Sequence, residues 1–244
     1  MIILEINDTY FIKKYTIKQN DLDKFDKVTL TSILDICQDG ASKHADILNV
    51  GFDVFNERKL FWVLSKNRVE IIKDLDKDDE VTLKTYQSEV GFAGFNRDYY
   101  LYNSNDELCV KADSKWCVLD RTNNKIVPVK DLNASTLVGE PKAFIDKYSR
   151  IDVLKEWDFD FDYQVMFTDL DHNLHMNNTK YTIPILNYFK EKRIYYTEID
   201  YINQSYIDDK LKYMIKKIED NVYIVNVLNV NRDVLCLKCL VKVR

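Results

Sequence analysis

The sequence predicts an α+β protein made of two similar halves, each an antiparallel sheet with a helix on one face. Three short sequence matches recur in the same order in both halves. In each half an alternating apolar segment precedes a helical pattern, and several long alternating segments follow it. Because these strands follow a single helix and do not alternate with helices, an antiparallel sheet is favoured over a parallel one.

The matches indicate an internal duplication. "YTIKQNDLDKFDKV" (15–28) aligns with "YQVMFTDLDHNLHM" (163–176), an offset of 163 − 15 = 148. "RVEIIKDLDKDDEVTLK" (68–84) aligns with "EIDYINQSYIDDKLKYM" (198–214), an offset of 198 − 68 = 130. "DELCVKA" (106–112) resembles "DVLCLKC" (233–239), an offset of 233 − 106 = 127. The shrinking offset places extra residues in the first copy, mostly between its helix and its second strand.

Each copy has the same expected layout. The first has a strand at about 10–18, then a helix near 28–48 with apolar residues on one face. That face carries Leu30, Ile33, Leu34 and Cys37. Further strands are expected near 60–72, 81–88, 96–102 and 110–119. The second copy is expected to have a strand at 158–167, a helix at 178–193, and strands near 194–203, 210–217, 223–230 and 235–243.

A linker is expected between the copies. "PVKDLNASTLVGEPKAF" (128–144) holds two of the three prolines, which favours a connecting segment. We therefore predict an N-terminal domain at 1–130, a linker at 131–157 and a C-terminal domain at 158–244.

Composition excludes several classes of protein. The 244 residues are 46% hydrophobic, with a net charge of −5 and a pI near 5.4, which argues against a general nucleic-acid binder. Gly-rich phosphate loops and a GxSxG elbow are absent. The sequence has neither an apolar run of 18 residues nor a secretory signal, so we expect a cytoplasmic protein with no membrane association.

The five cysteines give no sign of a disulfide or metal framework. Their odd number, without an export signal, predicts reduced thiols. "CLKC" (236–239) resembles half of a zinc site, but no second pair has suitable spacing, and the surrounding "VLCLKCLVKV" is typical of a strand. No metal or cofactor is therefore expected.

The chemistry of the chain is expected in "TDLDHNLHMNNTKY" (168–181), which holds two of the three histidines. Asp171, Asn173 and His175 are spaced by two residues, so in an extended segment their side chains share one face, while Leu174 and Met176 turn into the core. Asn173 and His175 have no counterpart in the first copy, so the shared scaffold does not require them. His44, in contrast, is expected to be a satisfied helix residue.

This segment could activate water for attack on an acyl group. His175 could accept a proton near neutral pH, Asn173 could orient water or polarise the carbonyl, and Asp171 could fix the histidine tautomer or the loop. A helix starting near Asn177 and Asn178 could stabilise an oxyanion. Thioesters suit such a site. Turn and cap chemistry is the alternative for Asp169 and Asp171, and metal binding ranks low.

The same residues resemble a known family. "DLDHNLHMNNTKY" is similar to the D-x-N-x-H-x-N-N-x-x-Y motif of the acyl-acyl carrier protein thioesterases. The resemblance continues in "DICQDGASKHADIL" (35–48), "RKLFWVLSKNRVEI" (58–71) and 95–129, and so covers nearly the whole chain. It implies two tandem hot-dog domains, each a long helix wrapped by an antiparallel sheet. The first would hold the acyl chain, and the second would carry the catalytic set of Asp171, Asn173 and His175.

The implied activity is hydrolysis of fatty acyl thioesters on acyl carrier protein. Unlike the plant members of the family, this sequence shows no transit peptide, which is expected of a cytoplasmic protein. One departure concerns Gln204, which stands where the family places a catalytic Glu, and glutamine cannot act as a base. Gln204 could orient water instead, or Asp200 or Asp208 could substitute for the missing carboxylate. The alternatives are a non-hydrolytic acyl-thioester-binding protein, an acyl-CoA thioesterase or a hydratase-like enzyme. Either a monomer or a homodimer is compatible with the sequence.

Overall fold

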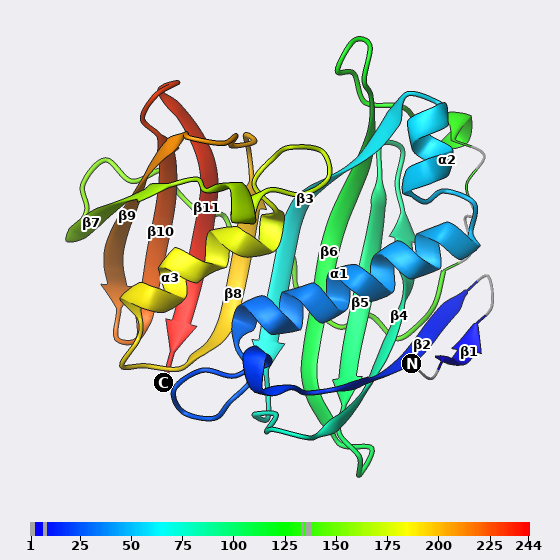
Figure 1. Cartoon of the computed structure of the whole chain (residues 1–244), viewed down its shortest axis with the longest axis horizontal. Helices are drawn as coiled ribbons and strands as arrows, with labels where there is room; N and C mark the ends of the chain where they lie inside the picture. The colour runs from blue at the N-terminus through cyan, green and yellow to red at the C-terminus, as the bar shows by residue number, and fades with distance from the viewer. Residues whose placement is uncertain (1–2, 7–8, 133, 135–137) are drawn as a thin grey trace. The chain divides into compact units, whose positions relative to one another are not determined.

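The structure is a computed structural model that describes residues 3–6, 9–132, 134 and 138–244 (Figure 1). The chain divides into two compact units. Unit 1 comprises residues 1–65 and 70–146, and unit 2 comprises residues 66–69 and 147–244. Within the described part of the chain, none of the helices has the length and apolar character needed to span a membrane.

Unit 1 is built on an antiparallel sheet in which the strand order is β1-β2-β4-β5-β6-β3. Its strands are β1 (Ile3–Ile6), β2 (Tyr10–Thr16), β3 (Leu60–Ile71), β4 (Glu80–Val90), β5 (Phe95–Tyr102) and β6 (Leu108–Asp120). The alternating segments predicted all of these except β1. A short 3₁₀ turn, η1 (Gln19–Asp21), precedes the long helix, and η2 (Val129–Asp131) follows the sheet.

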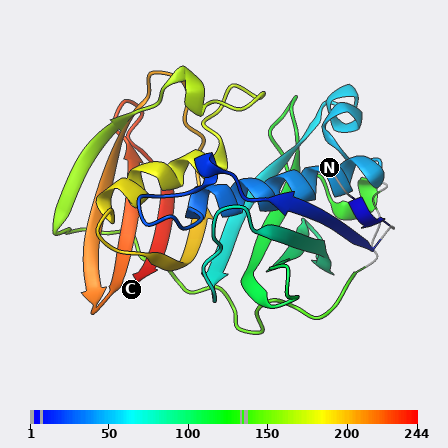
Figure 2. The same ribbon diagram turned by 60° about the horizontal axis from the view of Figure 1, so that its bottom comes forward.

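The long helix α1 (Leu30–Ile47) lies across this sheet against β2 and β4 (Figure 2). Thr29 caps its start by accepting a hydrogen bond from the Ser32 N–H at 3.0 Å. Asn49, with φ 56°, ends it in the left-handed region. The four residues predicted on the apolar face are all buried. α1 approaches β4 closely at Gly40, where an added Cβ would lie 2.3 Å from Leu83 Cδ2.

The residues inserted in the first copy form a second helix, α2 (Phe52–Glu57), which the sequence did not predict. Phe55 of α2 is buried and stacks on Trp62, with ring centroids 5.3 Å apart. Trp62 Nε1 in turn donates to the Val50 carbonyl at 2.8 Å. The insertion therefore closes one end of the unit 1 core, together with the buried Leu132 of the segment after β6.

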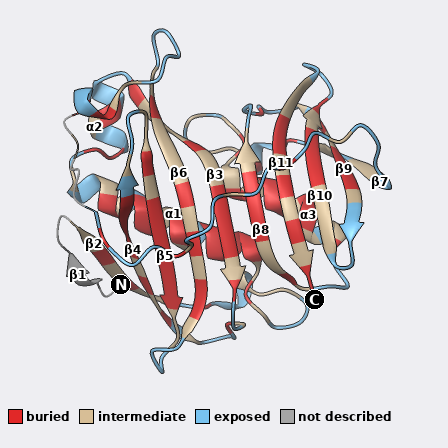
Figure 3. Ribbon diagram, turned by 180° about the vertical axis from the view of Figure 1, so that it is seen from behind, coloured by how far each residue is buried: buried red, intermediate tan, exposed pale blue. Residues whose placement is uncertain are grey.

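The strands of unit 2 also pair in antiparallel fashion, in the order β8-β11-β10-β9-β7. The strands are β7 (Phe159–Gln164), β8 (Ile194–Tyr201), β9 (Lys210–Glu219), β10 (Val222–Asn229) and β11 (Val234–Val243), close to the predicted ranges. β11 contains both cysteines of "CLKC", as expected of a strand. In each unit the buried residues follow the strands and the helix, and the exposed ones gather in the loops (Figure 3).

The helix of unit 2 is shorter than predicted. The expected helix at 178–193 is a 3₁₀ turn, η4 (Asn178–Tyr181), followed by α3 (Thr182–Tyr188). Ile185 is buried, and so is Phe189, the residue that ends α3. The next residues, "KEKR" (190–193), are all charged, so a longer helix would bury no further apolar surface.

Candidate active site

The predicted catalytic segment forms a tight turn. It follows the 3₁₀ turn η3 (Phe167–Asp169) and is closed by an antiparallel bridge between Leu170 and Met176. The Asp171 N–H donates to the His175 carbonyl at 2.8 Å. The Asp171 carboxylate accepts from the backbone N–H groups of Asn173 at 2.7 Å and His175 at 3.2 Å. Asp171 therefore fixes the loop that carries the other two side chains.

The turn corrects the expectation of an extended segment. Leu174, expected in the core, has φ 63° and is 69% exposed, because the turn requires a left-handed residue at its tip. Met176 is buried, as predicted. Asp171, Asn173 and His175 are each half-buried. The amide of Asn173 lies 3.1 Å from Nε2 of the exposed His172.

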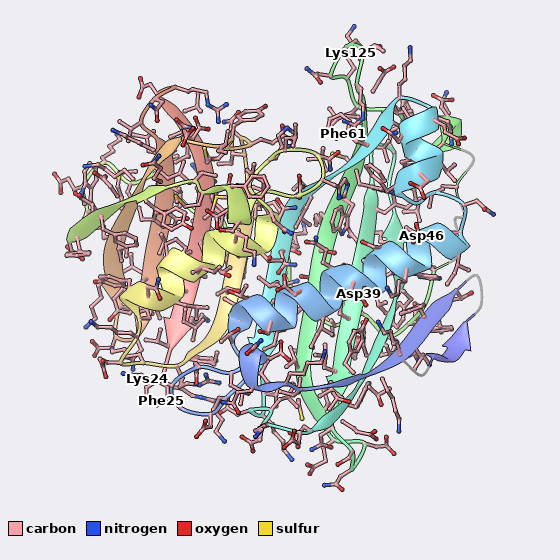
Figure 4. The ribbon with its side chains drawn as sticks, viewed as in Figure 1. Lys24, Phe25, Asp39, Asp46, Phe61 and Lys125 are labelled. Carbon is pink, nitrogen blue, oxygen red and sulfur yellow. The ribbon has the colours of Figure 1, made fainter. Side chains whose placement is uncertain are left out.

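Unit 1 contains the same turn 148 residues earlier. The Asp23 N–H donates to the Lys27 carbonyl at 2.9 Å, and the Asp23 carboxylate accepts from the N–H groups of Phe25 at 2.8 Å and Lys27 at 3.2 Å. Asp26 has φ 58°, in the left-handed region. Lys24 and Phe25 lie in this loop (Figure 4). A carboxylate thus holds the turn in both copies, whether or not a histidine follows.

A second shared contact brings a distant loop to the turn. The Met176 N–H donates to the Ser205 carbonyl at 2.8 Å, and in unit 1 the Val28 N–H donates to the Leu75 carbonyl at 3.0 Å. The offsets, 176 − 28 = 148 and 205 − 75 = 130, are those of the sequence matches. The duplication seen in the sequence therefore extends to individual backbone hydrogen bonds.

The side chains supported by this shared backbone differ between the units. In unit 1, Lys27 forms an ion pair with Asp76. The equivalent residues of unit 2 are His175 and Tyr206, since 175 − 27 = 148 and 206 − 76 = 130. Their rings pack edge to face, with centroids 5.0 Å apart and planes at 79°. Unit 2 thus places an imidazole against an aromatic ring where unit 1 has an ion pair.

Gln204 lies in the same loop as Tyr206 and is exposed. Its amide oxygen is 3.5 Å from the Tyr206 hydroxyl, and its backbone carbonyl accepts a hydrogen bond from Arg232. The structure therefore brings the loop of Gln204 to the turn of His175 through Tyr206. At the Gln204 position, offset by 130, the first copy has Asp74.

The two carboxylates considered as substitutes for a glutamate are engaged elsewhere. Asp200 forms ion pairs with Lys66 and, at 3.1 Å, with Lys238. Asp208 accepts from Gln164 Nε2 at 3.2 Å and has φ 64°, and its counterpart Asp78 has φ 63°. Asp208 thus belongs to a turn that recurs in both copies, which favours His175 over either carboxylate as a base.

The start of the unit 2 helix is already hydrogen-bonded. Asn177 caps it, as expected, by accepting from the Thr179 N–H at 3.1 Å. The Lys180 N–H donates to the Asn177 carbonyl at 2.9 Å, and the Asn177 N–H donates to the Asp169 carbonyl at 2.8 Å. These backbone donors at the helix start therefore already have acceptors within the protein.

Three buried polar residues lie behind this loop, and the sequence reasoning gave none of them a role. The Tyr181 hydroxyl donates to Ser205 Oγ at 2.8 Å, and Ser205 Oγ donates to Cys236 Sγ at 3.4 Å. Burial raises the pKa of both the Tyr181 phenol and the Cys236 thiol. Ser205 is 0% exposed, so this group supports the loop from inside and does not face a substrate. Tyr181 is the final residue of the family motif, and this was the sequence feature that could have identified it.

The third histidine of the chain, His44, belongs to unit 1. His44 is buried in α1, and its Nδ1 is 3.1 Å from Nη1 of Arg97, in keeping with a satisfied helix residue. Over the described ranges of the chain, no group of three or more His, Cys, Asp or Glu residues could hold a metal ion.

Comparison of the sequence with protein families identifies acyl-ACP thioesterases. The family model described as the acyl-ACP thioesterase N-terminal domain matches residues 8–135. A palmitoyl-acyl carrier protein thioesterase of Cuphea hookeriana is 23% identical over 185 residues, and one of Arabidopsis thaliana is 22% identical over 195 residues. Each match includes 70% of this chain, and the chain spans about 45% of the length of these relatives.

Solved structures show the same fold. An acyl-ACP thioesterase from Bacteroides thetaiotaomicron superposes with a TM-score of 0.87 at 20% identity, over 96% of this chain and 98% of the other. The 12:0-ACP thioesterase of Umbellularia californica gives a TM-score of 0.85 at 16% identity, over 99% of both chains. These likenesses confirm the α+β hot-dog fold that the resemblance predicted.

Proposed function

This chain belongs to the acyl-ACP thioesterase family, and we propose that it hydrolyses fatty acyl thioesters on acyl carrier protein to release free fatty acid. In this proposal unit 1 holds the acyl chain and unit 2 carries the chemistry. Asp171, Asn173, His175 and Gln204 form the proposed site.

The observation that carries the proposal is the difference between two otherwise matching turns. Lys27 and Asp76 neutralise each other in unit 1, and an ammonium group cannot accept a proton. A neutral imidazole at the equivalent position can accept one from water near neutral pH. Because the backbone hydrogen bonds are the same in both units, the turn itself does not require a histidine. The substitution is therefore best explained by a chemical role for His175.

The proposed reaction uses water as the nucleophile. His175 accepts a proton from water as the water oxygen bonds to the thioester carbonyl carbon, and the Asn173 amide donates to the developing oxyanion. When the tetrahedral intermediate collapses, the carbon–sulfur bond breaks and the imidazolium returns the proton to the leaving thiolate. The products are a fatty acid and the free thiol of the carrier.

The other two residues have supporting roles in this scheme. Asp171 acts through the loop, because its carboxylate binds the backbone N–H groups of Asn173 and His175. Gln204 is exposed and close to Tyr206, so its amide can orient the water or the substrate. An amide cannot replace a carboxylate as a base, which leaves this role to His175.

Thiol release from a panel of acyl-carrier-protein and acyl-CoA thioesters tests the proposal. Wild type should release thiol, faster from the carrier-protein thioesters, and His175→Ala should lower kcat by about 10²- to 10⁴-fold. Lys27→Ala is the matched control in unit 1 and should leave kcat within about threefold. Equal rates in wild type and His175→Ala would contradict the proposal.

The exposed amide of Gln204 favours one second candidate, an acyl-thioester-binding protein without hydrolysis. Gln204→Glu restores a carboxylate at this position, so the panel should include it. Binding of acyl carrier protein without turnover in wild type, together with turnover in Gln204→Glu, would favour the binding protein. Turnover in both would retain the enzyme.

A further inference from the structure

We infer that Tyr206, held in place by Arg232, is a positioning residue for the imidazole of His175. This inference rests on the proposed function, because it assigns to Tyr206 the task of aiming the proposed base. The side chains of His175, Tyr206 and Arg232 form a continuous stack. His175 packs edge to face on Tyr206, and the Arg232 guanidinium carbon lies 4.9 Å from the centroid of the same ring.

The stack is anchored to the backbone at Asp209. The Asp209 carboxylate is 12% exposed; it accepts from the Tyr206 N–H at 2.8 Å and pairs with the Arg232 guanidinium at 3.1 Å. Arg232 also donates to the Gln204 carbonyl, and its own N–H donates to Asn229 Oδ1 at 3.1 Å. Arg232 thus links the turn between β10 and β11 to the loop that carries Tyr206.

The first copy has the equivalent of the Asp209 hydrogen bond but not the equivalents of the three stacked side chains. The Asp76 N–H donates to the carboxylate of Asp79 at 2.8 Å, just as the Tyr206 N–H donates to that of Asp209. At the position of Arg232, offset by 127, the first copy has Asn105. The following residues, Asp106 and Asp233, both have positive φ, so the two turns correspond.

Three side chains that touch one another in unit 2 therefore all differ from their counterparts in unit 1. They come from three separate segments, around residues 175, 206 and 232. Shared backbone geometry explains none of the three differences. A common task explains all of them: Tyr206 restricts rotation of the imidazole, and Arg232 restricts Tyr206 through a cation–π contact.

Such a restriction matters because proton transfer is directional. The accepting nitrogen of a base must point at the water within hydrogen-bonding distance, and a small misplacement costs rate without weakening substrate binding. Removal of the Tyr206 ring or of the Arg232 guanidinium should therefore lower kcat and leave KM nearly unchanged. Removal of the Tyr206 hydroxyl alone should have little effect, because the contact with His175 is made by the ring.

The kinetic test uses the full chain with an acyl-carrier-protein thioester as substrate. Tyr206→Leu and Arg232→Gln should each lower kcat about tenfold with KM within about twofold, and Tyr206→Phe should retain most of kcat. Arg150→Gln is the matched control, because this arginine side chain is 93% exposed and pairs with the exposed Asp152 at 3.3 Å. A rise in KM at constant kcat, or an unchanged kcat in Arg232→Gln, would overturn the inference.

A spectroscopic test does not depend on turnover. The His175 ring protons, assigned by their loss in His175→Ala, lie beside an aromatic ring, so Tyr206→Leu should shift their NMR signals and Tyr206→Phe should preserve them. Arg232→Gln should shift or broaden the same signals, and Arg150→Gln should not. If wild type lacks hydrolysis but Arg232→Gln moves these signals, the proposed function fails while the positioning contact stands. Unmoved signals in Arg232→Gln would refute the contact itself.

Discussion

The imidazole of His175 lies edge to face on the ring of Tyr206, at the position where the first copy of the chain has an ion pair between Lys27 and Asp76. The two pairs occupy equivalent places on matching backbones. One pair includes an imidazole, which can accept a proton in its neutral form, and the other is an ion pair of opposite charges. The comparison of the two copies therefore separates the backbone contacts that the fold requires from the side chains that differ between the units.

Exchange of one pair for the other tests this equivalence. The double variant His175→Lys, Tyr206→Asp should fold and should lose hydrolysis, because it lacks the imidazole. The two substitutions should couple favourably by roughly 0.5 kcal/mol in the free energy of unfolding, the usual size for a partly exposed ion pair. Chemical denaturation of the wild type, both single variants and the double variant measures the coupling. A coupling of zero would mean that the unit 1 pair cannot form in unit 2.

Asp39 of α1 predicts a pH dependence of the stability of unit 1 (Figure 4). Burial raises the pKa of its carboxyl, but hydrogen bonds from Lys13, Lys43 and Tyr15 outweigh burial and hold the pKa below its ordinary value. A carboxyl with a lowered folded pKa contributes stability above its unfolded pKa, and this contribution is lost as pH falls through the folded pKa.

Asp39→Asn should therefore lower the free energy of unfolding at pH 7 by about 1 kcal/mol, a modest value because the Asp39 side chain is 37% exposed and solvent screens its ion pairs. The difference from wild type should shrink below about pH 4. Urea denaturation at pH 7 and at pH 3.5 measures both values. An equal difference at the two pH values would show that the charge of Asp39 does not contribute.

The close approach of α1 to β4 at Gly40 predicts a packing defect on substitution. In Gly40→Ala the new Cβ would lie 2.3 Å from Leu83 Cδ2, so Leu83 must move and the core must adjust. Overpacking of this kind typically costs about 1–3 kcal/mol. Gly91→Ala is the matched control, because its nearest neighbour would be the Gly94 carbonyl oxygen at 3.7 Å, an ordinary contact. Thermal denaturation should separate the two variants by several degrees.

The sequence predicted the strands well, because long strands with one buried face alternate clearly between apolar and polar residues. It predicted the unit 2 helix less well, because apolar spacing stops at Phe189 and the charged residues that follow still have high helix propensity. β1 and α2 were missed. β1 is only four residues long and α2 only six, which leaves little room for a periodic pattern.

The polar residues of the candidate site were chosen from the sequence, but the geometry of the turn that carries them was not predicted. The side chains of an extended segment and of a turn alternate in similar ways, so the spacing of Asn173 and His175 could not distinguish them. Tyr206 and Arg232 were missed because they follow His175 by 31 and 57 residues, and no local pattern connects them. The offsets of 148 and 130 could have identified the His175–Tyr206 pair, because they align these two residues with Lys27 and Asp76, which carry opposite charges.

Asp171 and Asp23 provide a matched test of structural and chemical roles. Each carboxylate accepts two backbone N–H groups in the same turn. Asp171→Ala and Asp23→Ala should therefore destabilise the protein by similar amounts, about 1–2 kcal/mol. Only Asp171→Ala should also lower kcat, by about tenfold or more, because only that turn carries Asn173 and His175. Denaturation curves and thiol-release rates for both variants check the two expectations, and an equal loss of rate in Asp23→Ala would place part of the chemistry in unit 1.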